Sequence, residues 1–260
     1  MKTRLYIAIC TAMVMASCST PRNFNYLQDL QNGQQTEITT DGTIRLQPSD
    51  QLTVIVKSKD PQMSNLFNKS FTTQMIQGTT AGNPYIAPYK VSPQGTIDIP
   101  VVGEIHVAGL TRYEVEKAIK DKLQQEHLKD ANVTVELQNL TYTLTGEVRN
   151  PGVYTIDKDQ LTLIEALGKA GDMDLYGKRD SVMVIRTEGN QRKTYILSLN
   201  SSKELFNSEA YNIRQNDIIY VKANNVRARQ STANGNETRN ISFWMSIVSV
   251  LTSVAILIFK

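Results

Sequence analysis

The chain has 260 residues, of which 40% are hydrophobic and 20% charged, a composition typical of globular domains with room for one or two cores. Basic residues outnumber acidic ones only slightly, 28 to 25, and the formal net charge is +3. This balance argues against a nucleic-acid partner and against a polybasic membrane patch.

The N-terminus has the pattern of a secretory signal peptide over residues 1–17. Lys2 and Arg4 precede an apolar run from Leu5 to Met15, and small residues follow it. The series Met15-Ala16-Ser17-Cys18 resembles a bacterial lipobox, in which the cysteine thiol is acylated and becomes the new N-terminus. We therefore expect lipidation at Cys18. The alternative is that Cys18 is only a small residue beside an ordinary signal-peptide cleavage site. The second cysteine lies inside the signal, so the mature chain is expected to form no disulfide.

The composition of residues 18–43, rich in Gln, Asn and Thr, predicts a polar tether between the lipid and the first domain. Ile44–Val56 then predicts a short strand, a Pro-Ser-Asp turn and a second strand. Residues 58–89 are interrupted by Gly and Pro and are expected to form mainly a long loop.

A small antiparallel sheet is predicted over residues 89–110, with turns at Gly95 and Gly103. Thr111 followed by Glu114 is a capping-box pattern that opens a helix reaching about residue 127. The alternating apolar residues of 133–137 predict a further half-buried strand.

A second unit is expected to start near Thr141. Its pattern predicts a strand over 142–148 and a tight turn at Asn150-Pro151-Gly152. The capping box of Thr162 predicts the start of a short helix, and this helix is expected to end at Gly171. Further strands are predicted around 182–185, 195–199 and 217–221. This order is typical of a small β-grasp-like fold, and the chain as a whole is assigned to the α+β class. Residues 223–239 are polar and predict a linker.

Residues 240–260 predict a C-terminal transmembrane helix, because Asn240–Phe259 holds twenty residues without a charge and a helix of that length measures about 30 Å. Four serines fall within a sector of about 60° on this helix: Ser242, Ser246, Ser249 and Ser253. The opposite face carries Trp244, Val248, Leu251 and Ala255. A narrow hydroxyl stripe suits a ring of helices around water. The alternatives are close packing of membrane helices, or hydroxyls that bond back to carbonyls of the preceding turn.

No catalytic or metal-binding constellation emerges from the sequence. His106 and His127 are isolated and have no cysteine nearby, and Asp172 and Asp174 follow a helix end, where carboxylates usually serve turn chemistry. Phosphate-binding glycine loops, nucleophile elbows and HExxH motifs are missing from the sequence. We therefore expect neither an enzyme nor a cofactor.

Several short motifs follow one another along the chain. Residues 44–138 contain Pro48-Ser49-Asp50, Val91-Ser92-Pro93-Gln94-Gly95, Ile99-Pro100-Val101-Val102-Gly103 and Val107-Ala108-Gly109-Leu110-Thr111. Residues 139–222 contain Gly146-Glu147-Val148, Asn150-Pro151-Gly152, Leu161-Thr162, Glu165-Ala166-Leu167, Ala170-Gly171 and Asp217-Ile218-Ile219-Tyr220-Val221. The chain resembles the bacterial outer-membrane polysaccharide export lipoprotein family, which combines an export domain with SLBB β-grasp domains and often a C-terminal membrane helix.

The motif residues expected to support the two domains structurally are Pro48, Asp50, Gly95, Pro100, Gly103, Gly109, Asn150, Pro151, Gly152, Gly171 and Asp217. The chain departs from the family pattern at Ser49, where glycine is common, and in having a single SLBB unit where some relatives have two.

The resemblance implies a ring-shaped homo-oligomer, commonly of eight chains, anchored in the outer-membrane lipid of a diderm bacterium with most of each chain in the periplasm. The C-terminal helices would form a barrel that conducts polysaccharide passively, and an inner-membrane polysaccharide co-polymerase or tyrosine-kinase-type partner would supply the energy. The serine stripe would then face the sliding polymer.

The alternative is a periplasmic lipoprotein that binds glycan or a partner protein and uses the terminal helix only as a second anchor. It is favoured by the strong apolarity of the helix, which risks arrest in the inner membrane during secretion. A pore predicts ring-sized oligomers in the outer membrane, whereas an anchored module predicts monomers or dimers.

Overall fold

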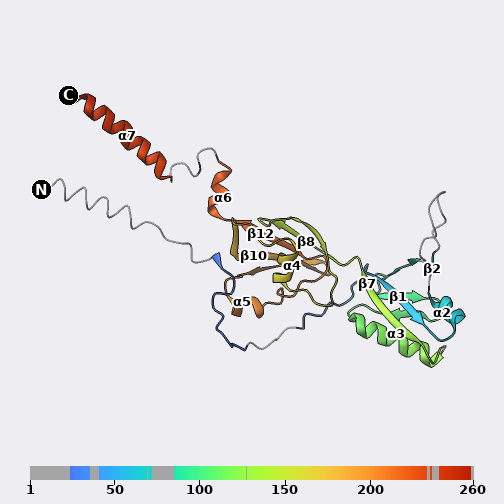
Figure 1. The fold of residues 1–260 in the computed structure, drawn as a ribbon. Coiled ribbons are helices and arrows are strands. Elements are labelled where there is room, and N and C mark those ends of the chain that lie inside the picture. Colours follow the sequence, from blue (N-terminus) through green and yellow to red (C-terminus); the bar gives the residue numbers. More distant parts are fainter. Residues whose placement is uncertain are drawn as a thin grey trace, which may run out of the picture.

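The computed structural model describes residues 24–35, 41–68, 70–71, 85–126, 128–232, 235 and 240–258. Within these residues the chain forms two units that mix helix and sheet, each with its own hydrophobic core, followed by a separate terminal helix (Figure 1). The α+β class is therefore confirmed. Cys18 and His127 lie outside the described residues.

The first unit is built around β1 (Gln51–Lys57), which pairs antiparallel with β7 (Asn132–Gln138) on one side and β4 (Tyr89–Lys90) on the other. The predicted turn at Gly103 joins β5 (Thr96–Ile99) to β6 (Gly103–His106) in an antiparallel hairpin.

The helix predicted after Thr111 is α3 (Arg112–Glu126), which packs along β7. Its capping box forms, since the Thr111 amide donates to Glu114 Oε2 at 2.8 Å and the Glu114 amide donates to Thr111 Oγ1 at 3.3 Å. The apolar face of the helix, including Val115, Ile119 and Leu123, is buried in the first core.

The predicted loop over residues 58–89 is wrong in part. It contains α2 (Pro61–Phe67) and the short strands β2 (Ser70–Phe71) and β3 (Tyr85–Ile86), which pair with each other. The helix begins because the Asp60 carboxylate accepts the Gln62 amide at 2.8 Å and proline at the first helical position has no amide to satisfy. The strand predicted at Ile44 is reduced to one bridge between Arg45 and Thr111.

The second unit contains a five-stranded sheet. Its strands are β8 (Thr141–Gly146), β9 (Gly152–Thr155), β10 (Gly177–Glu188), β11 (Gln191–Leu197) and β12 (Ile218–Ala223). They lie in the order β11-β10-β12-β8-β9, with β12 and β8 parallel and the other pairs antiparallel.

One face of this sheet packs against α4 (Leu163–Lys169) and α5 (Ser202–Phe206). The capping box predicted at Thr162 is present, and the buried Tyr142 hydroxyl donates to the Ala166 carbonyl at 3.1 Å. Ile44, expected to begin the first domain, is instead buried in this second core, and its amide donates to the Asp159 carbonyl.

The predicted tether does not extend freely where the structure describes it. Residues 24–35, here called the N-terminal strap, dock on the second unit, with the Leu27 amide donating to the Leu199 carbonyl at 2.8 Å. The Asp29 carboxylate accepts the Ser202 amide at 2.6 Å and also the Lys203 amide, which caps α5 and holds the pKa of Asp29 at about 2. Docking gives the polar groups of the strap specific hydrogen-bond partners, and the composition of the strap does not reveal these partners.

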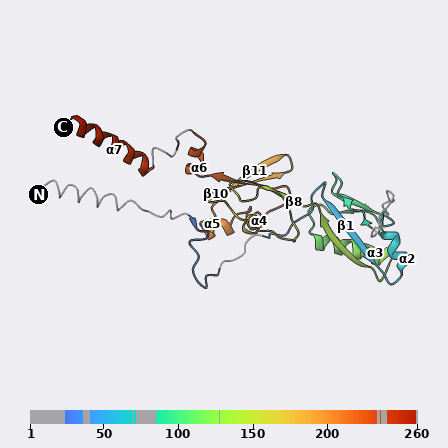
Figure 2. The same cartoon turned by 45° about the horizontal axis from the view of Figure 1, so that its top comes forward.

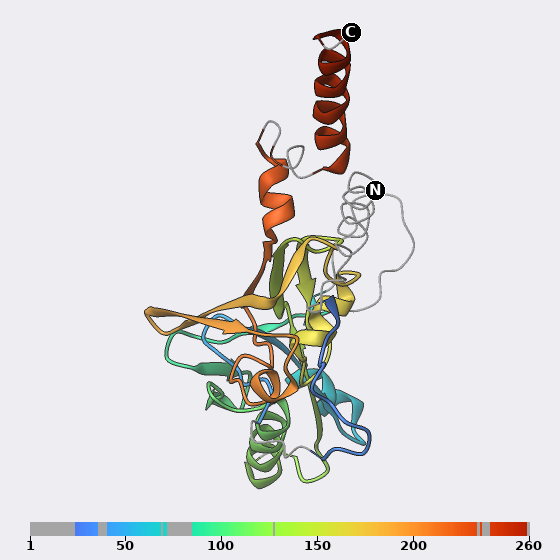
Figure 3. The same cartoon turned by 90° about the vertical axis from the view of Figure 1, so that its left-hand side faces the viewer.

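The predicted polar linker over 223–239 is also partly ordered. It contains α6 (Asn225–Gln230), because the Asn224 side chain accepts the amides of Val226 and Arg227 at 3.0 Å each. Figures 2 and 3 show α6 leaving the sheet after β12, with α7 (Ile241–Ile258) beyond it.

A buried ion pair fixes the entry to β12. Arg186 Nε lies 3.0 Å from Asp217 Oδ1 and Nη2 lies 2.7 Å from Oδ2, and both side chains are almost fully buried. The guanidinium also donates to the Glu209 and Asn212 carbonyls, and the Arg214 amide donates to Asp217. The arrangement satisfies both charges, so loss of one partner leaves the other uncompensated.

We expect Asp217→Asn to lower the free energy of unfolding by about 3–5 kcal/mol, because the buried Arg186 cation then lacks its counterion. The control Glu188→Gln breaks the half-exposed ion pair with Arg214. We expect this control to change the free energy of unfolding by less than about 1 kcal/mol. Chemical unfolding followed by circular dichroism measures both. Equal, small effects would contradict the structural role of the buried pair.

Candidate functional site

The terminal helix α7 is long and apolar enough to cross a membrane, judged by length and composition. None of its length is buried against the rest of the chain, and Leu257 is 83% exposed. A contiguous apolar surface of this size is a contact surface for lipid or for other protein.

The predicted serine stripe lies on this helix, and two of its hydroxyls make internal hydrogen bonds. Ser246 Oγ donates to the Ser242 carbonyl and Ser253 Oγ donates to the Ser249 carbonyl, both at 2.9 Å. This is the back-bonding arrangement foreseen as an alternative. A hydroxyl whose proton is used in this way keeps its acceptor lone pairs, so the stripe offers acceptors more readily than donors.

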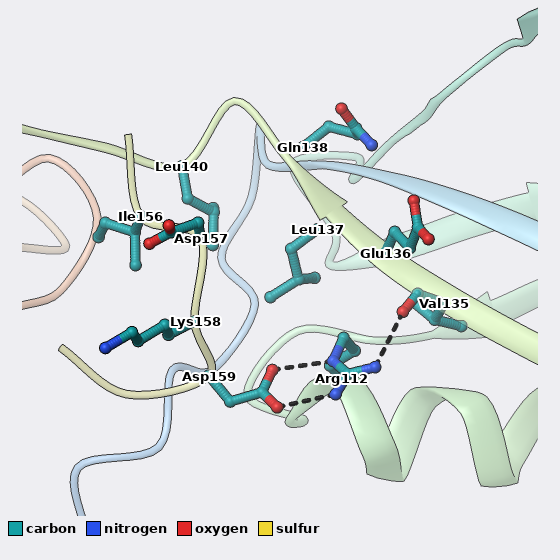
Figure 4. Close-up of a pocket in the computed structure, with 10 residues that line it drawn as sticks. All are labelled: Arg112, Val135, Glu136, Leu137, Gln138, Leu140, Ile156, Asp157, Lys158 and Asp159. Carbon is teal, nitrogen blue, oxygen red and sulfur yellow. Dashed lines mark hydrogen bonds and ion pairs between the residues drawn. The ribbon is translucent and has the colours of Figure 1, made fainter. Parts of the chain in front are cut away.

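The two units meet at a polar junction. Arg112 at the start of α3 forms a bidentate pair with Asp159 of the second unit, with Nε–Oδ1 and Nη2–Oδ2 distances of 2.8 Å, and it reaches the Val135 carbonyl at 3.4 Å (Figure 4). Hydrogen bonding to Arg112 lowers the pKa of Asp159. The pair borders a cavity of about 320 Å³ that is also lined by Glu136, Gln138, Leu137, Leu140, Ile156, Asp157 and Lys158.

A second contact of the junction is buried. Asp50 Oδ2 accepts the Gln47 amide at 2.8 Å and Gln215 Nε2 at 3.0 Å, while the same Gln215 nitrogen donates to the Arg45 carbonyl. Burial raises the pKa of the Asp50 carboxyl, because desolvation disfavours its charged form more than these hydrogen bonds favour it. The predicted motif residue Asp50 thus connects the two units through Gln215.

The glycines of the predicted motifs occupy turns. Gly95, Gly103, Gly109 and Gly171 all have φ between +77° and +82°. At Gly95 a Cβ would lie 2.6 Å from the Ala108 Cβ, so this position also demands a close approach. Ser49, the departure from the family pattern, has φ +78°, which explains why glycine suits that position.

The remaining motif residues are placed in separate regions. Pro48 lines a groove with Arg45 and Arg214, and Pro100 ends β5 at the hairpin turn. Asn150 Nδ2 donates to the Ala170 carbonyl at 3.1 Å and so ties the turn of Pro151 and Gly152 to the end of α4. The structure brings Pro48 and Gly109 to one groove and Asn150 beside Gly171. Asp50 and Asp217 have different partners, Gln215 and Arg186.

The five-stranded sheet leaves an apolar face uncovered. Its mainly apolar stretch, here called the outer face, is formed by Thr143, Val153, Met183, Ile185, Ile196, Ile218 and Tyr220, and Thr145 and Thr194 lie on the same side of the sheet. Ile218 lies opposite Ile185 and Thr143, and the alternating neighbours of Ile218 and Tyr220 are buried in the core. Val153 is 67% exposed and Ile196 is 64% exposed. A solvated sheet face is normally polar, so this face indicates a contact surface.

Sequence reasoning missed Arg112, Asp159 and Gln215. Each is a single polar residue whose partner lies in the other unit, so no local pattern marks it. Among the described residues, no three His, Cys, Asp or Glu side chains lie together in a way that could hold a metal ion.

Comparison with known proteins gives two family matches and several relatives. Residues 34–138 match the family described as polysaccharide biosynthesis/export protein, and residues 141–221 match the SLBB domain.

Among the relatives, the EPS I polysaccharide export outer membrane protein EpsA of Ralstonia solanacearum is 34% identical over 122 residues, which cover 46% of this chain and 31% of that protein. The polysialic acid transport protein KpsD of Escherichia coli is 34% identical over 89 residues, covering 33% of this chain and 16% of that protein. The chain thus spans less than a third of the length of these relatives.

The two junction carboxyls are expected to give stability profiles of opposite sign. The folded pKa of Asp50 is raised, so its contribution is fully present below the unfolded value of about pH 4 and is lost as pH rises through the folded pKa. The folded pKa of Asp159 is lowered, so its contribution is present above about pH 4 and is lost as pH falls through the folded pKa.

We therefore expect the stability of the natural protein relative to Asp50→Asn to fall as pH rises above about 4, and its stability relative to Asp159→Asn to fall as pH drops below about 4. Unfolding midpoints in detergent between pH 3 and 7 measure both differences. Profiles of the same sign would contradict the buried, desolvated environment of Asp50.

Proposed function

We propose that this chain, a member of the polysaccharide biosynthesis/export protein family, is one subunit of an oligomeric ring. In this proposal the ring forms a channel in the outer membrane, and a polysaccharide passes through it. The names of its relatives support export as the process and the outer membrane as the location. The observation that carries the proposal is the exposed apolar helix α7, placed after two units that match the export and SLBB families.

We assign residues 44–138 to the export domain and residues 139–222 to an SLBB domain of β-grasp type. The β-grasp assignment is supported by the mixed sheet, in which the first and last strands, β8 and β12, lie side by side and parallel while α4 packs on one face. Cys18 is proposed as the lipid anchor and α7 as the membrane span.

The proposed channel is a barrel of α7 helices. The 18 residues of α7 measure about 27 Å, which matches the hydrocarbon core of a bilayer, but one helix encloses no passage. Several copies would place their serine stripes toward the lumen and their apolar backs toward lipid. Hydroxyl oxygens that accept weakly from sugar hydroxyls would let a chain slide without holding it.

Conduction in this proposal is passive, and the energy comes from an inner-membrane polysaccharide co-polymerase or tyrosine-kinase-type partner. The outer face of the sheet is proposed as a contact between neighbouring subunits, which is supported by its uncovered apolar side chains. Monomers in detergent would instead favour the anchored binding module.

The double substitution Ser246→Leu and Ser249→Leu is expected to abolish surface polysaccharide while the oligomer still forms, because bulky apolar groups would narrow and dry the lumen. The control Val248→Leu changes the opposite face and should leave export intact. Immunodetection of polysaccharide on intact cells and native mass of the extracted protein give the two readouts. Normal export by the double variant would rule out the lumen-facing stripe.

The double substitution Ile218→Lys and Tyr220→Lys is expected to reduce the native mass in detergent from a closed ring to small species, because charges cannot be buried without partners at the contact. Tyr113→Lys, at a residue 71% exposed on the first unit, is the control and should leave the mass unchanged. Intact rings from the double variant would show that subunits meet elsewhere.

A further inference from the structure

We propose that the end of the second unit beside α6 rests on the membrane surface through a patch that we call the Leu175 patch. It consists of the apolar residues Phe24, Leu175 and Val226 and the cations Lys178 and Arg179. The inference rests on the proposed function, in that it takes Cys18 and α7 as membrane attachments, and it adds a third contact with lipid.

The patch is assembled from three segments that are far apart in the sequence. Phe24 begins the described strap, Leu175 lies in the turn before β10, and Val226 lies in the first turn of α6. Together they line a shallow cavity of about 540 Å³. All three side chains are exposed, and Leu175, at 59%, is the most exposed of them. Exposed apolar residues that converge in this way mark a contact surface rather than scattered surface positions.

Two arginine side chains lie over aromatic rings that line the cavity. The Arg179 guanidinium lies 4.3 Å from the centre of the Phe24 ring, and the Arg227 guanidinium lies 5.5 Å from the centre of the Tyr176 ring. Lys178 and Arg179 are the charged groups that the cavity itself presents, together with Asp180. Amphipathic rings beside long cationic side chains are the composition found at the level of lipid headgroups.

The acidic groups of this region are engaged within the protein. The Glu147 carboxylate pairs with Arg227 at 3.4 Å, Asp180 accepts from the Ser181 hydroxyl, and Asp174 accepts the Leu175 amide. Lys178 and Arg179 are the cations that the cavity offers to lipid phosphates, with the Asp180 carboxylate beside them. Arg179 also donates to the Gly177 carbonyl. In the proposal, the apolar side chains enter the headgroup boundary.

The position of the patch in the chain points to the same partner. Phe24 lies six residues after Cys18, a stretch that reaches about 20 Å at most, so a lipid on Cys18 would hold the patch close to the bilayer. Val226 belongs to the helix that precedes α7. Figure 1 shows the start of the strap and α6 at one end of the second unit and the first unit at the other.

The test places a photoreactive benzoylphenylalanine at position 175 of the full-length protein in phosphatidylethanolamine–phosphatidylglycerol vesicles that contain an alkyne-tagged phospholipid. We expect lipid adducts at position 175 to exceed those at position 113 at least fivefold. Tyr113 is the control, because it is also exposed, at 71% against 59% for Leu175, but lies on α3 of the first unit. Equal labelling at the two positions, or a cross-link from position 175 to a second chain in place of lipid, would overturn the inference.

A third probe at Leu257 in α7 separates this inference from the proposed function. Labelling at 257 without labelling at 175 leaves the membrane span in place and overturns the Leu175 patch. Labelling at 175 without labelling at 257 supports the patch and removes the span on which the channel depends. Absence of lipid adducts at both positions overturns both proposals.

Discussion

The constraint on which the rest of this structure depends is the exposure of α7. Full burial of a Val, Leu, Ile, Phe or Met side chain is worth about 1.5–3 kcal/mol, so a helix composed largely of such residues favours an apolar environment by tens of kcal/mol. Within the part of the chain that the structure describes, no part of the helix is buried against the two units. The proposed membrane span would therefore set where the protein resides, and the two units would set what is presented there.

The two units have separate cores, and polar contacts join them beside Leu137, which packs against both cores. Arg112 and Asp159 meet at the surface of the junction, whereas Asp50 and Gln215 meet inside it. A bidentate ion pair and a buried carboxyl–amide contact both require one relative orientation, because their hydrogen bonds tolerate little displacement. These contacts can thus hold the first unit in register with the second. In the proposed ring, such a junction would align neighbouring subunits.

Sequence patterns predicted correctly the helices that are set by residues close together in the chain. The capping boxes at Thr111 and Thr162 were predicted because both partners lie three residues apart, and both helices form. The helix after Asp60 was missed although its Asp-Pro start is a local signal, because Gly and Pro residues further along suggested a loop. Contacts between Asp50 and Gln215, 165 residues apart, and docking of the strap through Asp29 on α5 have no local signal. These contacts exist only in the folded chain.

The internal hydrogen bonds of α7 bear on how such a helix could serve a moving sugar polymer. When Ser246 and Ser253 donate to carbonyls of the preceding turn, their protons are engaged and their oxygens remain as acceptors. Sugar hydroxyls can then act as donors at many equivalent positions, and each such bond is exchanged against water at little net gain. A lumen with these properties would wet the polymer without trapping it. The same internal bonds lower the cost of inserting the helix into lipid, because fewer hydroxyl protons are left without a partner. In the proposed channel, insertion and conduction would therefore place compatible demands on one serine stripe.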